Sequence, residues 1–191
     1  MRVMHRILRT FLVFLLLAAA GFAQTPDFAE TKKKAEAGDA AAQYNLGLMY
    51  ARGDDVTNDF VEAAKWLDMA AEQYFSPAQF MLGVMYKRGD GVAKDSNIAV
   101  KFFQLGALQG NADAQYSLGG MYAFGDGIEK DLVQAHFWIN EAAHENADAK
   151  KSLALVESQM TGAQISEAIE KEKRFNQAHA LLAKLLKRNT L

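Results

Sequence analysis

Equivalent residues return every 36 positions along this chain. Gln43, Gln79 and Gln115 lie one period apart, and the same interval separates equivalent glycines, tyrosines and aspartates. The equivalent sets are Gly47, Gly83 and Gly119; Tyr50, Tyr86 and Tyr122; Gly53, Gly89 and Gly125; and Asp59, Asp95 and Asp131. A fixed period of this length is typical of a solenoid, in which one small unit stacks on copies of itself.

Each period predicts two helices. In the first copy, apolar residues recur at the spacing of one buried helical face, at Ala42, Leu46, Met49 and Tyr50. Gly53 and its equivalents are expected to end this first helix in the left-handed conformation, and Asp59 and its equivalents to cap the second helix. The chain also has only two prolines. The prediction is therefore an all-α solenoid of stacked antiparallel helix pairs.

The period divides the chain into an array with a cap at each end. The array covers residues 39–160, with repeats at about 39–74, 75–110 and 111–145 and a degenerate half-repeat at 146–160. Residues 24–38 predict an N-terminal capping helix. Residues 161–191 predict a C-terminal capping helix and tail, with an apolar face that includes Ile165, Ile169 and Phe175. A partner-docking or dimerising role for this last helix stays open, as does the oligomeric state.

Two positions depart from the repeat. Asp55 stands where the later copies have Gly91 and Gly127, and a positive φ there would cost about 1 kcal/mol relative to glycine. The second junction also lacks a glycine, and Ser76-Pro77 is expected to supply an N-cap followed by a proline at the first helical position.

Residues 1–23 have the pattern of a cleavable secretory signal peptide. Arginines precede an apolar run at residues 11–20, which is shorter than the ~20 residues of a membrane span, and Gly21 and Ala23 suit a cleavage site after Ala23. The expected location is the periplasm or the exterior, without a stable membrane anchor after cleavage. Removal of three arginines lowers the net charge from −2 to −5, and the chain has no cysteine. The mature chain must therefore hold together by packing alone.

Catalytic and cofactor motifs are missing from the sequence. It has no cysteine nucleophile and no G-x-S-x-G motif, so we expect no enzyme and no cofactor. His136, Asn140 and His144 form a stripe with the spacing of metal ligands, but the neighbouring copies supply no third ligand, so a satisfied or surface histidine is expected instead. No basic run suggests a nucleic-acid partner.

The repeated frame A-x-A-Q-x-x-L-G-x-x-Y-x-x-G-x-G-V-x-x-D-x-x-x-A-x-x-W-x-x-x-A-A resembles the Sel-one-like repeat (SLR), a relative of the tetratricopeptide repeat. The resemblance covers about residues 35–145 in three copies. It implies a right-handed helical superstructure that serves as a scaffold for protein–protein contacts. Exported bacterial members are often adaptors or regulators in signalling and envelope processes. The resemblance does not identify one partner.

Analogy with tetratricopeptide stacks places the first helix of each pair on the concave side. Its non-core positions are then the candidate protein- or peptide-binding residues: Tyr44, Leu48, Arg52, Phe80, Val84, Lys87, Arg88, Tyr116 and Phe124. Aromatic residues and arginine are typical of interface hot spots. The alternative, that the periodic aromatic residues only pack between helices, stays open.

The leading hypothesis is an exported, non-enzymatic scaffold that binds a protein or peptide through its concave face and regulates an envelope signalling or assembly process. One alternative is a β-lactam or cell-wall hydrolase, an activity associated with cysteine-rich relatives, although this chain has neither the cysteines nor a nucleophile–base pair. A further alternative is the binding of an envelope polysaccharide on the aromatic residues.

Overall fold

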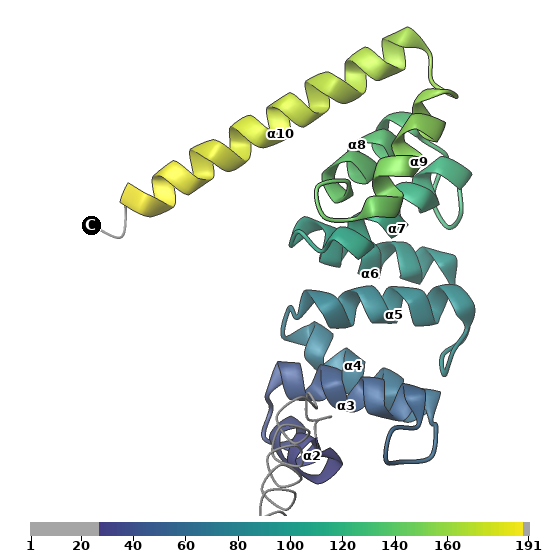
Figure 1. Cartoon of the computed structure of the whole chain (residues 1–191), viewed down its shortest axis with the longest axis vertical. Helices are drawn as coiled ribbons and strands as arrows, with labels where there is room; N and C mark the ends of the chain where they lie inside the picture. Colours follow the sequence, from purple (N-terminus) through teal and green to yellow (C-terminus); the bar gives the residue numbers. More distant parts are fainter. Residues whose placement is uncertain (1–26, 189–191) are drawn as a thin grey trace, which may run out of the picture.

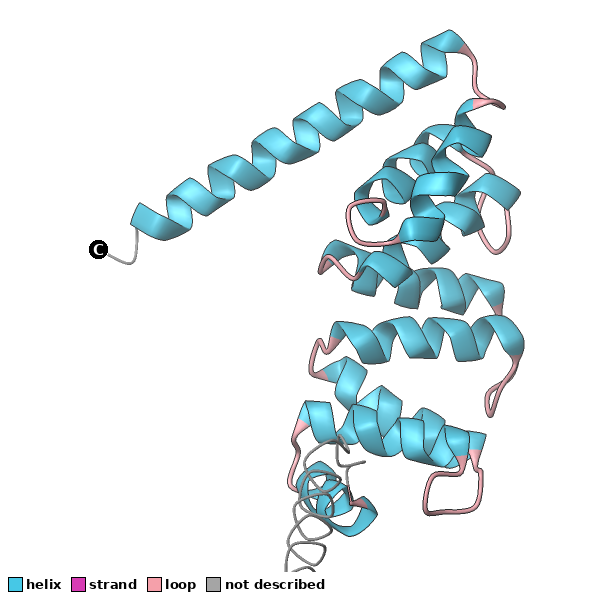
Figure 2. Ribbon diagram, viewed as in Figure 1, coloured by secondary structure: helices cyan, strands magenta, loops and turns pink. Residues whose placement is uncertain are grey.

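The computed structural model describes residues 27–188, and the predicted signal peptide at 1–23 lies outside them. Within residues 27–188 the chain is helical and contains no strand (Figure 2). The helices are α2 (Phe28–Glu36), α3 (Ala40–Arg52), α4 (Phe60–Glu72), α5 (Ser76–Arg88), α6 (Ser96–Leu108), α7 (Ala112–Phe124), α8 (Leu132–Ala142), α9 (Ala147–Glu157) and α10 (Gly162–Arg188). The all-α prediction is confirmed.

The helices pack in the order of the chain. α3 packs on α4, α5 on α6 and α7 on α8, while α4–α5 and α6–α7 contacts join successive pairs. α2 covers α3 at one end, and α9 packs on α8 at the other. Figure 1 shows these helices as one column from α2 to α9. The predicted solenoid of stacked helix pairs is therefore confirmed.

The periodic glutamines join successive helix pairs. Gln43, Gln79 and Gln115 are buried. The side-chain Nε2 of each donates a hydrogen bond to the backbone carbonyl of the residue eight positions earlier, Ala35, Ala71 and Ala107, at 3.2, 3.3 and 3.2 Å. The last carbonyls of a helix lack a partner within that helix. Each of these three carbonyls already accepts one backbone N–H from the turn after its helix. The glutamine adds a second hydrogen bond, which fixes the next helix against it.

The predicted caps are present at the second helix of each pair. Asp59, Asp95 and Asp131 each accept two backbone N–H hydrogen bonds from the first turn that follows, at 2.8–3.1 Å. At the other helix of the pair, Gly53, Gly89 and Gly125 end α3, α5 and α7 with φ of 79°, 87° and 71°. Both predictions are confirmed.

The second turn position needs glycine for two reasons. Gly91 and Gly127 both have φ of 70°, and a Cβ at Gly91 would lie 2.1 Å from the carbonyl oxygen of Phe60. Asp55 also has a positive φ, 59°, so the condition for strain at this position is met. The residue one period before Phe60 is Gln24, which lies outside residues 27–188. At Asp55 the backbone strain of a positive φ is therefore present.

The junction between α4 and α5 differs from the prediction. The N-cap of α5 is Phe75, which offers no side-chain hydrogen bond, while Ser76 begins the helix and Pro77 is its second residue. Tyr74, with φ of 61°, occupies the place of Gly110. The expected N-cap at Ser76 was wrong because the stack keeps the register of the other junctions. Proline is tolerated at this position because the first-turn N–H groups of a helix have no partner within it.

The last helix contacts the array through one face. α10 packs on α8, where Ala168 is fully buried and the ring of Phe175 meets that of Phe137 edge-on at 5.2 Å. Ile169, expected in the apolar face, is 53% exposed, because Ala168 faces α8 instead. In Figure 1, α10 then runs outward from the column. Whether this helix only caps the array stays a prediction. None of the helices within residues 27–188 is long and apolar enough to cross a bilayer.

Candidate functional site

The three aromatic residues proposed for the concave face are half-buried between helices. The ring of Tyr44 lies 5.4 Å from that of Phe75, and the ring of Phe80 lies 6.1 Å from that of Phe103. Burial raises the pKa of the Tyr44 hydroxyl. The hydroxyl of Tyr116 lies 2.9 Å from Ser152 Oγ of α9. Each ring therefore leaves only part of its surface for a partner.

The other predicted residues divide between two hollows and the open surface. Leu48 and Arg52 line a hollow of about 470 Å³ at the end of α3, together with Asp54 and Asp55. Lys87 and Phe124 line the groove described next, as does Tyr116. Val84 packs against the core of the second and third pairs, and Arg88 is exposed. The nine predicted residues therefore do not line one common hollow, and their role in binding stays a prediction.

A groove between α7 and α9, which we call the α7–α9 groove, is the most apolar of these hollows. It has a volume of about 440 Å³. Ile139 and Val156, 2% and 5% exposed, belong to its lining. Phe124 and Leu155 also line it and are 85% and 63% exposed. Large apolar side chains beside a hollow with a buried apolar lining are typical of a protein-binding site.

A change in the repeat opens this groove. Gly120 occupies the position of Leu48 and Val84 in the first two copies, and no atom lies within 4 Å of the place where its Cβ would be. The neighbouring Gly119 is different, because a Cβ there would lie 2.5 Å from Ile139 Cγ1. Gly119 therefore permits helix packing, whereas Gly120 leaves open space in the groove.

The groove carries positive charge only. Lys87 from α5 and Lys130 from the turn before α8 are the only charged residues in its lining. Both are exposed, and neither forms an ion pair within residues 27–188. Two ammonium groups are therefore available to a partner.

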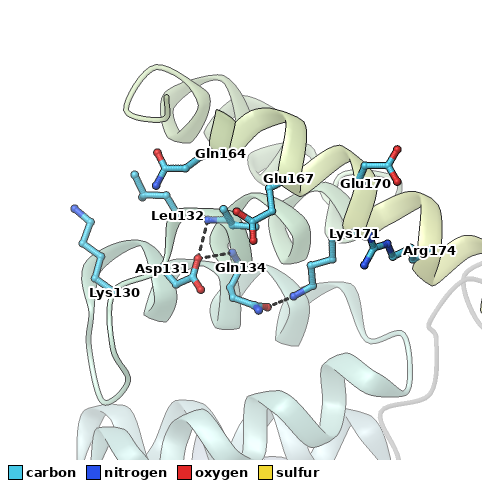
Figure 3. Close-up of a pocket in the computed structure, with 10 residues that line it drawn as sticks. Lys130, Asp131, Leu132, Gln134, Gln164, Glu167, Glu170, Lys171 and Arg174 are labelled. Carbon is cyan, nitrogen blue, oxygen red and sulfur yellow. Dashed lines mark hydrogen bonds between the residues drawn. The ribbon is translucent and has the colours of Figure 1, made fainter. Parts of the chain in front are cut away.

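A polar cleft of about 760 Å³ lies between the start of α8 and α10 (Figure 3). Three of its polar side chains are engaged by the fold: Asp131 caps α8, and Lys171 Nζ donates to Gln134 Oε1 and lies 4.7 Å from the centre of the Phe137 ring. Burial lowers the pKa of the Lys171 ammonium. Figure 3 shows Glu167 and Glu170 on the α10 side of the same cleft. The contacts of Lys171 with Gln134 and Phe137 join α10 to α8, so this cleft has a role in holding α10.

The histidine stripe does not assemble a metal centre. His136 is buried, its Nε2 lies 3.1 Å from Glu157 Oε1, and its Nδ1 lies 3.2 Å from Glu172 Oε1. His144 is exposed. Across residues 27–188, no three histidine, aspartate or glutamate side chains are arranged to hold a metal ion. His136 instead joins α8 to α9 and α10.

The comparison with known families agrees with this geometry. A model of the Sel1 repeat matches residues 40–75, 76–111 and 112–146, more than half of the chain. The chain belongs to the Sel1 repeat family. Sel1 repeats typically mediate protein interactions, and the fold suggests a protein–protein interaction scaffold. Sel1 and tetratricopeptide-like repeat proteins are generally non-catalytic.

Two solved structures have the same Sel1 architecture. A Sel1 repeat protein from Oxalobacter formigenes is 34% identical, with a TM-score of 0.60 over 62% of this chain and 49% of that one. A protective antigen of uropathogenic Escherichia coli with an SLR fold is 31% identical, with a TM-score of 0.64 over 76% of this chain and 33% of that one. The match therefore spans about half of the first protein and a third of the second. No curated protein matches the chain.

Sequence reasoning missed the α9 side of the groove. Ser152, Leu155 and Val156 belong to the degenerate half-repeat, whose pattern predicts a helix but not which of its residues stay uncovered. A signal was nevertheless present on α7, because Gly120 replaces the larger residues of the earlier copies.

Proposed function

We propose that this Sel1 protein is a non-enzymatic scaffold that holds a polypeptide segment of a partner in the α7–α9 groove, which we assign to the concave face of the solenoid. The observation that carries the proposal is the pair Phe124 and Leu155, exposed beside a hollow that has buried apolar residues in its lining.

The geometry supports binding through one or two apolar side chains of the partner more than it supports a broad flat interface. The hollow of about 440 Å³ is large enough for one or two apolar side chains, and the two exposed residues can cover them from either side. Burying apolar surface contributes about 25 cal/mol per Å², so most of the affinity would come from these few contacts.

Filling the hollow tests this function. Gly120→Val restores the residue that the second repeat carries, and the open space at Gly120 lets the fold accept it. Peptides selected from a random library on the native chain, then labelled and titrated by fluorescence polarisation, should bind Gly120→Val at least tenfold more weakly, a loss of about 1.4 kcal/mol.

Truncation of the exposed residues gives an independent measurement. Phe124→Ala and Leu155→Ala should each weaken binding about tenfold, as expected for hot-spot residues. Leu108→Ala is the matched control, because Leu108 is 66% exposed and lies on α6 outside the groove. Peptides that bind Gly120→Val and the native chain equally would contradict the proposal.

We further propose that the protein is exported and meets its partner in the cell envelope, where a scaffold of this kind would serve signalling or assembly. The basic and apolar segments at residues 2–20 support this, together with the small residues Gly21 and Ala23.

Mass spectrometry of the chain expressed in a bacterium tests export. The expected mass is that of a chain beginning at Gln24, found in the periplasmic fraction or the medium. An Ala23→Arg variant should remain uncleaved, because the site requires a small residue there. An intact native chain in the cytoplasm would rule out this location.

A further inference from the structure

We propose that the segment held in the α7–α9 groove is acidic as well as apolar, with an apolar side chain in the hollow and carboxylates beside it. This inference rests on the proposed function of the groove and specifies the chemistry of its occupant.

The charges that line the groove point to such a partner. Lys87 and Lys130 are its only charged residues, and no acidic side chain lines it, although the chain as a whole has 23 acidic and 21 basic residues. The two lysines come from different elements, α5 and the turn before α8. Lys130 has an acidic residue on each side. Glu129 is exposed and does not line the groove, and Asp131 accepts hydrogen bonds from the backbone N–H groups that begin α8.

Three other polar side chains of the groove already have hydrogen-bond partners within the fold. The hydroxyls of Tyr116 and Ser152 bond to each other at 2.9 Å, and Gln159 Nε2 donates to the backbone carbonyl of Leu155 at 3.4 Å. The two ammonium groups are therefore the charged donors that a partner can engage without breaking a bond of the fold.

The lysines would select for charge more than they would supply affinity. Exposed ion pairs are weak, so two of them together should favour a carboxylate over its neutral amide by about fivefold to tenfold. This preference should shrink at high ionic strength, because salt screens exposed charges over about 10 Å at 0.1 M. The apolar contribution should not weaken with salt.

The experiment begins by panning a random peptide library on the full chain and on Gly120→Val, and retaining the peptides that only the native chain binds. We expect these groove-dependent peptides to combine apolar residues with Asp or Glu. Each selected peptide is then compared with a twin in which Asp and Glu are replaced by Asn and Gln. The acidic member should bind about fivefold to tenfold more tightly at low salt.

Charge removal from the groove completes the test. In the double variant Lys87→Met and Lys130→Met, the acidic and amide peptides should bind with equal affinity, and the amide peptide should bind as it does to the native chain. Lys101→Met is the matched control, because Lys101 is exposed on α6 and does not line the groove. It should keep the preference for the acidic peptide.

The outcomes separate this inference from the function on which it rests. The inference of an acidic segment would be overturned if the groove-dependent peptides lacked acidic residues, or if the acidic and amide peptides bound with equal affinity. Either result would still leave the groove as a binding site. A preference for acid that survives the double lysine variant would also overturn it. If no peptide distinguishes the native chain from Gly120→Val, the proposed function fails and the inference fails with it.

Discussion

We expect Gly91→Ala to lower the free energy of unfolding by about 3 kcal/mol, which combines the strain of a positive φ with overpacking against a neighbouring repeat. Alanine at this position would keep φ near 70° and place its Cβ 2.1 Å from the carbonyl oxygen of Phe60. That oxygen belongs to the backbone at the start of α4, so it cannot turn aside as a flexible side chain would. The loop must separate from α4, which weakens the contact between the first and second pairs.

Gly110→Ala is the matched control because it measures the cost of a positive φ at alanine without a steric clash. Gly110 has φ of 82°, and no atom lies within 4 Å of the place of its Cβ. This variant should lose only about 1 kcal/mol. Conversely, Asp55→Gly should gain up to about 1 kcal/mol, because it removes the backbone strain at φ of 59°. Urea unfolding followed by circular dichroism measures all three, and equal losses at Gly91 and Gly110 would contradict the steric argument.

The repeat made most of the fold predictable. Residues that recur with the period act on their own helix pair or the next one, so one copy predicts the others. Gly53 and Asp59 were assigned to a helix end and a cap, and both have these roles. The positive φ at Asp55 followed from the glycines at the same position in later copies. At Ser76 local residue preferences favoured an N-cap, but the register imposed by stacking moved the cap to Phe75.

The site was less predictable because it depends on where the repeat stops. The apolar pattern of α10 allowed more than one face toward the array, and contact with α8 selected Ala168 instead of Ile169. Likewise, α9 leaves Leu155 uncovered because it has no complete pair beyond it. Gly120 could be recognised from sequence as a smaller residue, but its effect depends on how α9 lies beside α7.

His136→Leu should produce the second large loss of stability, about 2 kcal/mol at pH 7, because it removes the buried partner of two carboxylates. The His136 side chain is 5% exposed. Of its two carboxylate partners, Glu172 is 18% exposed and Glu157 43%, so water can replace the lost contact less easily at Glu172 than at Glu157. His136 Nδ1 and Glu172 Oε1 lie 3.2 Å apart, so the imidazole is the nearest polar partner recorded for this carboxyl. The contact joins α10 to α8, and its loss should loosen the last helix first.

The pH dependence distinguishes this charge effect from a packing defect. Burial raises the pKa of the Glu172 carboxyl, and the charges of Glu141 and Glu157 add to the rise, while His136 opposes it. A carboxyl whose pKa is higher in the folded chain than in the unfolded one contributes most at low pH, and this contribution is lost as pH rises through the folded pKa. Without His136 the pKa of Glu172 should rise further, so the loss caused by His136→Leu should be larger at pH 7 than at pH 4.5.

A double-mutant cycle separates the two residues. His136→Leu combined with Glu172→Leu should recover much of the lost stability, because two apolar side chains replace a charge left without its partner. His144→Leu, at an exposed position just beyond α8, should change stability by less than about 0.5 kcal/mol. A loss at His136→Leu that is independent of pH and persists in the double variant would assign His136 to packing alone. A loss that follows pH and is recovered would show that the attachment of α10 depends on the contact between His136 and the Glu172 carboxyl.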